Sequence, residues 1–345
     1  MPFKIIRNDI TKVKADIIVN TANPKPIYVS GTDLAIYQAA GADALLAERK
    51  KIGNIARGDI AVTGAYALKA KYIIHTVGPV WVDGNHHEFE ILENCYAKSL
   101  QKALELGCES IAFPLIATGV YGFPKDQALQ IAVSVFSRFL MENDMQIILV
   151  VFDKRSFQLS GQLVGEISSY IGANEIRKKS AAEYSRRSYP LEPETPYRDD
   201  TYEVCRCYSE AESDEPFADD HDALTLEEEL AGIGMSFHDK LFELIGQSGL
   251  DNKDVWKRAN LDRKHFSKIQ CDKKYHPKKK TVMALCIALE LDLEQAKDLL
   301  ARADWAFSPS SRVDLIVQKA IAEKQYDIYQ LNLVLFKYTN EILGV

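Results

Sequence analysis

Two loops in the first half of the sequence combine amide, carboxylate, hydroxyl and glycine residues at spacings that suit an anion. The first runs from Asn20 to Asp33 as Asn-Thr-Ala-Asn-Pro-Lys-Pro-Ile-Tyr-Val-Ser-Gly-Thr-Asp. The second runs from Ala117 to Pro124 as Ala-Thr-Gly-Val-Tyr-Gly-Phe-Pro. Glycines let backbone N–H groups approach an anion closely, and the start of a helix favours negative charge. Two such loops facing each other can hold a diphosphate; ordinary tight turns are the alternative.

The elements that must position these loops alternate between strand-like and helix-like patterns. Apolar runs of strand length span 15–20, 71–77, 110–116 and 146–152, and helical periodicity spans 34–41, 88–106 and 126–140. This alternation predicts an α/β domain with a largely parallel sheet. Because both loops follow strands of that sheet, we expect them at its carboxyl edge, where open α/β sheets bind ligands.

The first half of the chain resembles the macrodomains, a family that binds ADP-ribose. The resemblance covers about residues 3–172 and rests on five motifs: Asp9-Ile-Thr11, Val19-Asn-Thr-Ala-Asn23, Ala35-Ile-Tyr-Gln-Ala-Ala-Gly41, Tyr72-Ile-Ile-His-Thr-Val-Gly-Pro79, and Phe113-Pro114 leading to 117–124. It implies a three-layer α/β/α fold, with a mixed, largely parallel sheet and an ADP-ribose cleft.

The resemblance also implies roles for individual residues in binding. Asp9, followed by Ile10, would accept a hydrogen bond from the adenine amino group, and Phe152 would stack on adenine. The diphosphate and distal ribose would lie against the two loops, at Asn23, Ser30, Gly31, Thr118, Gly119, Val120 and Tyr121. The alternatives are that Asp9 only starts a turn and that Phe152 is a core residue.

Catalysis in the hydrolytic branch of the family uses water, without a metal, a cofactor or a protein nucleophile. The resemblance makes Asn23 and Asp33 the catalytic pair. Asn23 would orient the distal ribose, and Asp33 would position or deprotonate water. One departure is that Tyr28-Val-Ser-Gly31 stands where that branch carries a run of glycines. Another is that Tyr37 stands where that branch carries histidine. Asp33 as a simple helix N-cap remains an alternative, and His75 is expected to be a hydrogen-bonded core residue.

The rest of the chain divides by charge and predicts two further regions after a domain over 1–174. The net charge of −7 is concentrated in residues 175–235, which hold 7 basic and 17 acidic side chains. With its prolines, this composition predicts a disordered linker. Residues 236–345 predict an all-helical domain, with helices near 236–245, 254–259, 263–270, 280–289, 293–301, 312–322 and 328–338.

The helical domain contains a strongly basic stretch within 253–280, with 11 Lys and Arg residues against three Asp. Its pattern is similar to the helix-turn-helix of phage-repressor-like regulators over roughly 250–303. Asp262 would N-cap the second helix, and Val255, Ala259, Leu261, Phe266 and Ile269 would form the inner face. The candidate DNA-contacting residues are Arg263, Lys264, Ser267, Lys268, Lys273 and Lys274. A protein-interaction module with solvated lysines is the alternative.

These features predict a cytoplasmic protein that binds ADP-ribose or ADP-ribosylated protein and hydrolyses mono-ADP-ribosyl esters. The alternative is a non-catalytic ADP-ribose or nucleotide sensor that acts as a transcriptional regulator or interaction adaptor. The longest apolar runs have strand length, and the N-terminus lacks a signal-peptide layout, so we expect no membrane partner. We expect no metal or cofactor. The oligomeric state, the target and the cleaved linkage stay open.

Overall fold

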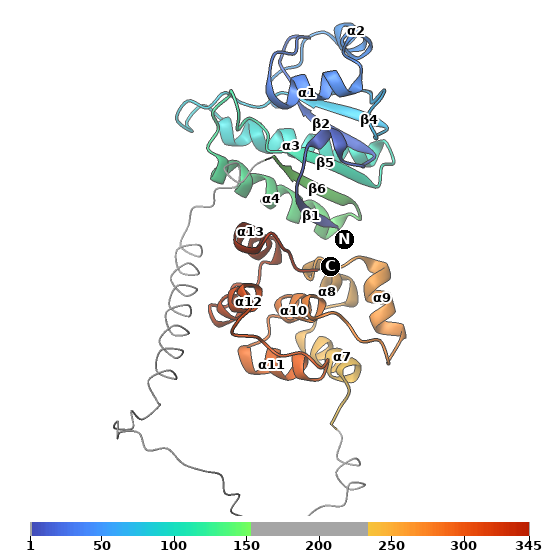
Figure 1. Cartoon of the computed structure of the whole chain (residues 1–345), viewed down its shortest axis with the longest axis vertical. Helices are drawn as coiled ribbons and strands as arrows, with labels where there is room; N and C mark the ends of the chain where they lie inside the picture. The colour runs from blue at the N-terminus through green and yellow to red at the C-terminus, as the bar shows by residue number, and fades with distance from the viewer. Residues whose placement is uncertain (1, 153–233, 345) are drawn as a thin grey trace, which may run out of the picture. The chain divides into compact units, whose positions relative to one another are not determined.

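The computed structural model describes residues 2–152 and 234–344. The predicted linker over 175–235 therefore lies, apart from its last two residues, outside the described residues. The elements of residues 2–152, here called the α/β part, are built around a six-stranded sheet in the order β1-β6-β5-β2-β4-β3 (Figure 1). The strands are β1 (Phe3–Arg7), β2 (Ile17–Thr21), β3 (Ile60–Gly64), β4 (Tyr72–Thr76), β5 (Ser110–Pro114) and β6 (Gln146–Val151). All neighbours pair in parallel except β3 and β4, so the sheet is mixed.

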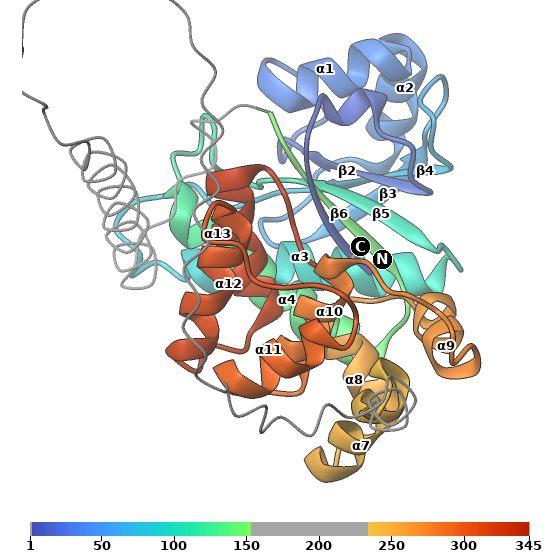
Figure 2. The ribbon, with the colours of Figure 1, turned by 60° about the horizontal axis from the view of Figure 1, so that its bottom comes forward.

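Helices cover both faces of this sheet (Figures 1 and 2). One face packs against α1 (Gly31–Ala40), α2 (Ala42–Ile52) and the 3-10 turn η1 (Ile10–Lys12), and the other packs against α3 (Glu88–Glu105) and α4 (Lys125–Glu142). Side chains alternate between the two cores along each strand, as the pleat requires. Ile18 belongs to the α1 side, whereas Ile17 and Val19 belong to the α3 side. The expected three-layer α/β/α architecture is confirmed.

Residues 234–344, here called the helical part, contain seven helices close to the predicted positions. They are α7 (Phe237–Ser248), α8 (Asn252–Arg258), α9 (Arg263–Cys271), α10 (Lys279–Ala288), α11 (Leu293–Ala301), α12 (Arg312–Ala322) and α13 (Ile328–Thr339). Asp262 caps α9 as predicted, accepting a hydrogen bond from His265 N at 2.8 Å. The predicted inner face is buried at all five positions, which are Val255, Ala259, Leu261, Phe266 and Ile269. Within the described ranges, no helix combines the length and apolar character needed to cross a membrane.

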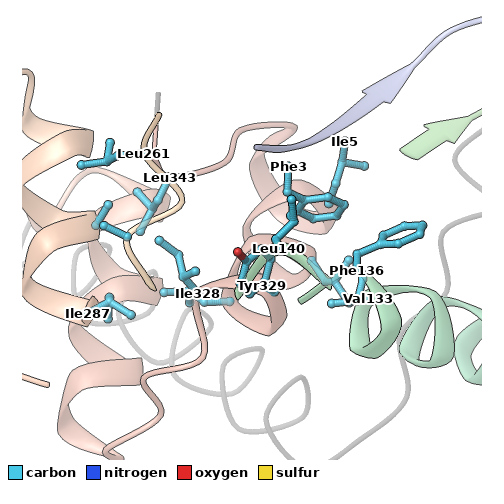
Figure 3. Close-up of a cluster of buried hydrophobic side chains, with 14 of the residues drawn as sticks. Phe3, Ile5, Val133, Phe136, Leu140, Leu261, Ile287, Ile328, Tyr329 and Leu343 are labelled. Atoms are coloured by element: carbon cyan, nitrogen blue, oxygen red, sulfur yellow. The ribbon is translucent and has the colours of Figure 1, made fainter. Parts of the chain in front are cut away.

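The α/β part and the helical part share one continuous hydrophobic core and belong to one compact unit. Figure 3 shows the shared cluster. Phe3 of β1 lies between Phe136 of α4 and Tyr329 of α13, with ring centroids 5.9 and 5.8 Å away. Leu140 of α4 and Leu343 after α13 belong to the same cluster. Burial of such apolar surface is the main favourable term in packing.

Two buried polar side chains of the helical part bind the backbone of the α/β part. Asn260 Oδ1 accepts from Phe3 N at 3.0 Å, and its Nδ2 donates to Phe3 O at 3.1 Å and to Leu343 O at 3.3 Å. Lys257 Nζ donates to Met141 O at 2.7 Å, near the end of α4. Burial lowers the pKa of Lys257. Asn260 therefore occupies the hydrogen-bonding groups of Phe3 on edge strand β1, and one lysine of the basic stretch is buried rather than solvated.

Candidate functional site

The two predicted loops lie at one edge of the sheet, as expected from their positions after parallel strands. Thr21 at the end of β2 pairs with Thr76 at the end of β4, and Pro114 at the end of β5 pairs with Val150. On the other side of β6, Arg7 at the end of β1 pairs with Val151. The residues that follow these strands therefore line the carboxyl edge, where an open α/β sheet binds its ligand.

Asp33 is a buried polar group held by two amides at this edge. Its side chain is buried, and each carboxylate oxygen accepts from a different amide. Asn20 Nδ2 donates to Oδ1 at 2.8 Å, and Asn23 Nδ2 donates to Oδ2 at 3.1 Å. Asn23 is partly exposed, so the pair joins a buried carboxylate to an accessible amide. The structure thus brings the predicted catalytic residues into direct contact.

Burial raises the pKa of Asp33 from its usual range to about 6, against the lowering effect of the Asn20 and Asn23 hydrogen bonds and the charge of Arg49. Arg49 is itself buried, and its guanidinium donates to the backbone oxygens of Asn23 and Pro24 at 3.3 and 3.2 Å and to that of Gly53. A carboxylate with a pKa near the working pH suits general-base chemistry, because it is mostly ionised yet still accepts a proton.

Asp33 is not an N-cap, so that alternative interpretation is wrong. The helix begins three residues earlier than the pattern suggested, with Ser30 as N-cap and Gly31 as the first residue of α1. Ser30 makes no side-chain capping bond, and Gly31 has φ +63, a conformation that favours glycine. Asp33 lies in the first turn, where the helix start stabilises its negative form.

The two aromatic residues that depart from the hydrolytic pattern pack on each other. The Tyr28 and Tyr37 rings stack with centroids 4.5 Å apart and planes 18° apart. Tyr37 of α1 is buried in the core between α1 and the sheet, and Tyr28 packs against the same core. Val29 is mostly exposed. The Tyr28 ring is therefore held against Tyr37.

The second predicted loop, Ala117–Pro124, forms a turn with free donors. Gly122 N donates to Gly119 O and Phe123 N donates to Ala117 O, both at 3.0 Å, and Gly122 has φ +70. Within the described part of the chain, no hydrogen bond is made by the backbone N–H groups of Thr118, Gly119, Val120 and Tyr121. Val120 is 88% exposed. Unpaired N–H groups in a turn suit an anionic ligand.

Tyr121 in this loop is fixed by a neighbour that sequence reasoning missed. The Arg57 guanidinium lies over the Tyr121 ring at 5.0 Å from its centroid, and Arg57 Nη1 donates to Gly78 O at 2.7 Å. Trp81 N donates to Tyr121 O at 2.8 Å. Arg57 therefore fixes the ring of Tyr121, the aromatic predicted to contact the distal ribose, while Trp81 fixes its backbone.

The residues predicted for adenine follow β1 and β6, which pair side by side. Asp9 does start a turn, because its Oδ1 accepts from Thr11 N at 3.0 Å and from Thr11 Oγ1 at 2.8 Å. Both bonds use Oδ1, which leaves Oδ2 for another donor. Ile10 is buried. Phe152 is 76% exposed, so its interpretation as a core residue is wrong.

Two buried polar residues at the site were not among the predicted site residues. Asn20 and His75 lie within the apolar strands β2 and β4, and both are fully buried. His75 is hydrogen bonded, as expected of a core histidine, but its partner is the Asn20 amide that binds Asp33. A polar residue inside an apolar strand was the signal that could have identified them.

The candidate DNA-contacting residues lie in the helical part. Arg263, Lys264, Ser267 and Lys268 are exposed on α9, and Lys273 and Lys274 are exposed in the turn that follows. Arg263 and Lys264 line a cavity of about 400 Å³ together with residues of the α/β part, which include Glu109 and Asp144. The start of α9 therefore adjoins acidic side chains at the amino edge of the sheet.

One group of potential metal ligands lies outside the two predicted loops in the sequence, between β4 and the start of α3. Ligand atoms of Asp83, His86 and Glu88 lie within 4.8 Å of one another. The Glu88 carboxylate, however, accepts from the backbone N–H groups of Val82, Asp83, Gly84 and His86. These bonds give the cluster a structural role in shaping the loop before α3.

Comparisons with known proteins place the sequence pattern of this site among macro domains. The family model described as "Macro domain" matches residues 19–132. A macro domain-containing protein of Methanosarcina mazei is 46% identical over 155 residues, covering 44% of this chain and 82% of that protein. An O-acetyl-ADP-ribose deacetylase of Citrobacter rodentium is 42% identical over 165 residues, covering 46% of this chain and 93% of that protein.

Solved structures with similar sequences include two macrodomains with bound nucleotides. The Oceanobacillus iheyensis macrodomain with ADP is 37% identical and covers 44% of this chain and 84% of that chain, with a TM-score of 0.42. The Trypanosoma brucei macrodomain in complex with ADP-ribose is 34% identical and covers 45% of this chain and 66% of that chain, also with a TM-score of 0.42. Each of these matches, like those to the two relatives, covers less than half of this chain.

Proposed function

Because the chain belongs to the macro domain family, we propose that its carboxyl-edge site binds ADP-ribose and hydrolyses mono-ADP-ribosyl esters. The observation that carries the hydrolytic part is the buried Asp33 carboxylate, held by Asn20 and Asn23 beside an accessible amide. The relative named O-acetyl-ADP-ribose deacetylase supports ester chemistry. The substrate class is O-acetyl-ADP-ribose or ADP-ribose esterified to glutamate or aspartate.

In this proposal, adenine lies against Asp9, Ile10 and Phe152 at the ends of β1 and β6. The diphosphate accepts hydrogen bonds from the unpaired N–H groups of the 118–121 turn and lies near the start of α1, at Ser30 and Gly31. The distal ribose then lies between Tyr121 and Asn23. These assignments follow the resemblance and agree with the backbone donors that the 118–121 turn leaves free.

The proposed chemical step is attack of water on the ester carbonyl carbon. Asp33 accepts a proton from the water as its oxygen bonds to that carbon, and the carbon–oxygen bond to the ribose then breaks. Asp33 passes the proton it took from water to the ribose oxygen as that oxygen leaves, so the products are a free carboxylic acid and ADP-ribose, and Asp33 is again ionised. Asn23 holds the ribose hydroxyls in place, which lowers the entropic cost of reaching the transition state.

We expect the rate to depend on the ionisation of Asp33. Its raised pKa means that the acidic limb of activity lies near pH 6, instead of near pH 4 for an ordinary aspartate. Turnover should therefore be lost as the pH falls through 6, because protonated Asp33 cannot take a proton from water. A plot of log kcat/KM against pH from 3.5 to 8 measures this limb, and a limb near pH 4 would contradict the role of buried Asp33.

We also expect Asp9→Ala to weaken ADP-ribose binding. Loss of one charge-assisted hydrogen bond costs about 1.5–3 kcal/mol, and calorimetric titration of ADP-ribose measures the change. Asp43→Ala is the matched control, because it removes a carboxylate from the first turn of α2, outside the predicted site. Equal affinities of Asp9→Ala and wild type for ADP-ribose would show that adenine does not bind at the end of β1.

A second candidate function for the helical part is nucleic-acid binding, which the exposed basic residues of α9 and its following turn favour. This function fits the alternative in which a non-catalytic ADP-ribose sensor acts on DNA. Because Glu109 and Asp144 adjoin Arg263 and Lys264, we assign phosphate contacts to Lys268, Lys273 and Lys274. Base contacts by Arg263, Lys264 and Ser267 require the DNA to reach the start of α9.

If the full chain binds DNA, affinity should fall by about 0.9 log units per log unit of salt for each phosphate contacted. The double variant Lys273→Ala/Lys274→Ala removes two proposed phosphate contacts, so the slope of log affinity against log salt should become less steep by about 1.8. Lys297→Ala on α11 removes an exposed lysine that pairs with Glu294, and it should leave the slope unchanged. Absence of any mobility shift at low salt would favour the protein-interaction module.

A further inference from the structure

We propose that His75, backed by Thr63, is a positioning residue that orients the Asn20 amide toward Asp33. His75 does not face substrate, since it is fully buried within β4. Its imidazole instead connects β3 to β2 and, through Asn20, to α1. The inference deepens the proposed function, because it says what holds the proposed base in place.

The hydrogen bonds form a chain with a single consistent direction. Asn20 Nδ2 donates both to Asp33 Oδ1 at 2.8 Å and to His75 Nδ1 at 3.1 Å. His75 Nδ1 must then be an acceptor, so the ring proton lies on Nε2 and is donated to Thr63 Oγ1 at 2.9 Å. The Thr63 hydroxyl in turn donates to Gly64 O at 3.2 Å.

The opposite orientation of the Asn20 amide is unfavourable on both sides. It would turn the Asn20 oxygen toward the Asp33 carboxylate and toward His75 Nδ1, which both accept. In the observed orientation, Asn20 Oδ1 is buried without a partner among the described residues. Leaving a buried acceptor unpaired costs free energy. The amide is thus oriented by its two acceptors, of which His75 Nδ1 is one.

The surroundings of His75 keep it neutral. Burial, together with the charge of Arg49, lowers the pKa of His75 to about 3. The other titratable groups around the chain are Tyr37, whose ring centroid lies 6.2 Å from that of His75, and Tyr28, stacked on Tyr37. Glu48 accepts from Gly64 N beside Thr63. A neutral His75 with its proton on Nε2 is the form that these hydrogen bonds require.

The first test observes the imidazole directly in the full-length wild-type protein, without a ligand. The nitrogen chemical shifts of His75, measured by NMR between pH 5 and 8, should show the neutral form with the proton on Nε2 throughout. A proton on Nδ1, or protonation of the ring near pH 6.5, would overturn the inference. This result does not depend on whether the protein hydrolyses anything.

The second test removes the support at its far end, where no contact with Asp33 exists. Thr63→Val keeps the shape but removes the acceptor for His75 Nε2–H, whereas Thr63→Ser keeps the hydroxyl. Loss of the orienting bond weakens the Asn20 hydrogen bond that lowers the pKa of Asp33. We expect Thr63→Val and His75→Phe to raise the pKa of Asp33 by about one, measured by carbon NMR of its carboxyl group. Thr63→Ser should leave it unchanged.

Thr76→Val is the matched control. Thr76 is buried like Thr63 and lies on the same strand as His75, but its hydroxyl donates to Asp59 O and takes no part in the hydrogen bonds that link Thr63, His75, Asn20 and Asp33. If the enzyme is active, Thr63→Val should lower turnover about fivefold at pH 6 and hardly at all at pH 8.5, because only the ionised fraction of Asp33 changes. Equal losses at both pH values, or an unchanged Asp33 pKa in both Thr63→Val and His75→Phe, would overturn the inference. A protein without turnover would refute the proposed hydrolysis, while the NMR measurements would still decide the role of His75.

Discussion

Asp33→Ala and Asn23→Ala should each reduce the turnover of an ADP-ribosyl ester by about 10²- to 10⁴-fold, because Asp33 is the proposed general base and Asn23 holds the ribose for the same step. Asp33 is buried and bound by two amides, and Asn23 joins that carboxylate to the accessible side of the loop. Both residues are proposed to act at the distal ribose and its ester. ADP-ribose affinity should therefore fall far less than turnover, because adenine and diphosphate contacts remain.

Calorimetry with ADP-ribose and initial rates with O-acetyl-ADP-ribose, measured on the same preparations, separate these two effects. Lys25→Ala is the matched control, because Lys25 is exposed in the same loop as Asn23. Its turnover should equal that of wild type. Equal turnover of wild type and the Asn23→Ala/Asp33→Ala double variant would show that neither residue takes part in the reaction.

Asn260→Ala should lower the free energy of unfolding by about 4 kcal/mol. The side chain serves three backbone groups, Phe3 N, Phe3 O and Leu343 O, and each buried group left unpaired costs about 1–3 kcal/mol. Asn260 also has φ +52, which alanine adopts less readily than asparagine. Asn260→Gly removes the side chain without this strain, so it isolates the loss of the hydrogen bonds.

Denaturant unfolding of the full chain measures both variants. Asn252→Ala, at the start of α8, removes a partly exposed amide and should change stability by less than about 0.5 kcal/mol. Wild-type stability of Asn260→Gly would show that the helical part does not hold β1. The interface also bears on activity, because β1 and β6 carry the predicted adenine residues Asp9 and Phe152 at their ends.

The periodic patterns of the sequence were sufficient for most of the fold. Strong apolar runs predicted β2, β4, β5 and β6, and the three- and four-residue spacing predicted α3, α4 and the helices from α7 to α13. They were not sufficient for β1, β3 or α2. β3 pairs only with β4 at the end of the sheet and is partly exposed, so its apolar pattern is weak.

The candidate site was predictable where residues follow strands directly, as Asn23 and Thr118 do. The residues that support it were not, because their contacts come from distant elements. Arg49 reaches the backbone of Asn23 from α2, Arg57 reaches Tyr121 from the loop before β3, and His75 reaches Asp33 only through Asn20. The contact of Asn260 with Phe3, 257 positions away, leaves no local pattern in the sequence.

The most direct test of the central claim is the release of ADP-ribose from an ester-linked substrate by the full-length wild-type protein at pH 7.5, followed by chromatography. The proposed function predicts release of ADP-ribose together with one equivalent of carboxylic acid, and loss of this release in Asp33→Ala. Tight ADP-ribose binding without release from O-acetyl-ADP-ribose or from glutamate- and aspartate-linked substrates would contradict the hydrolase and favour the non-catalytic sensor.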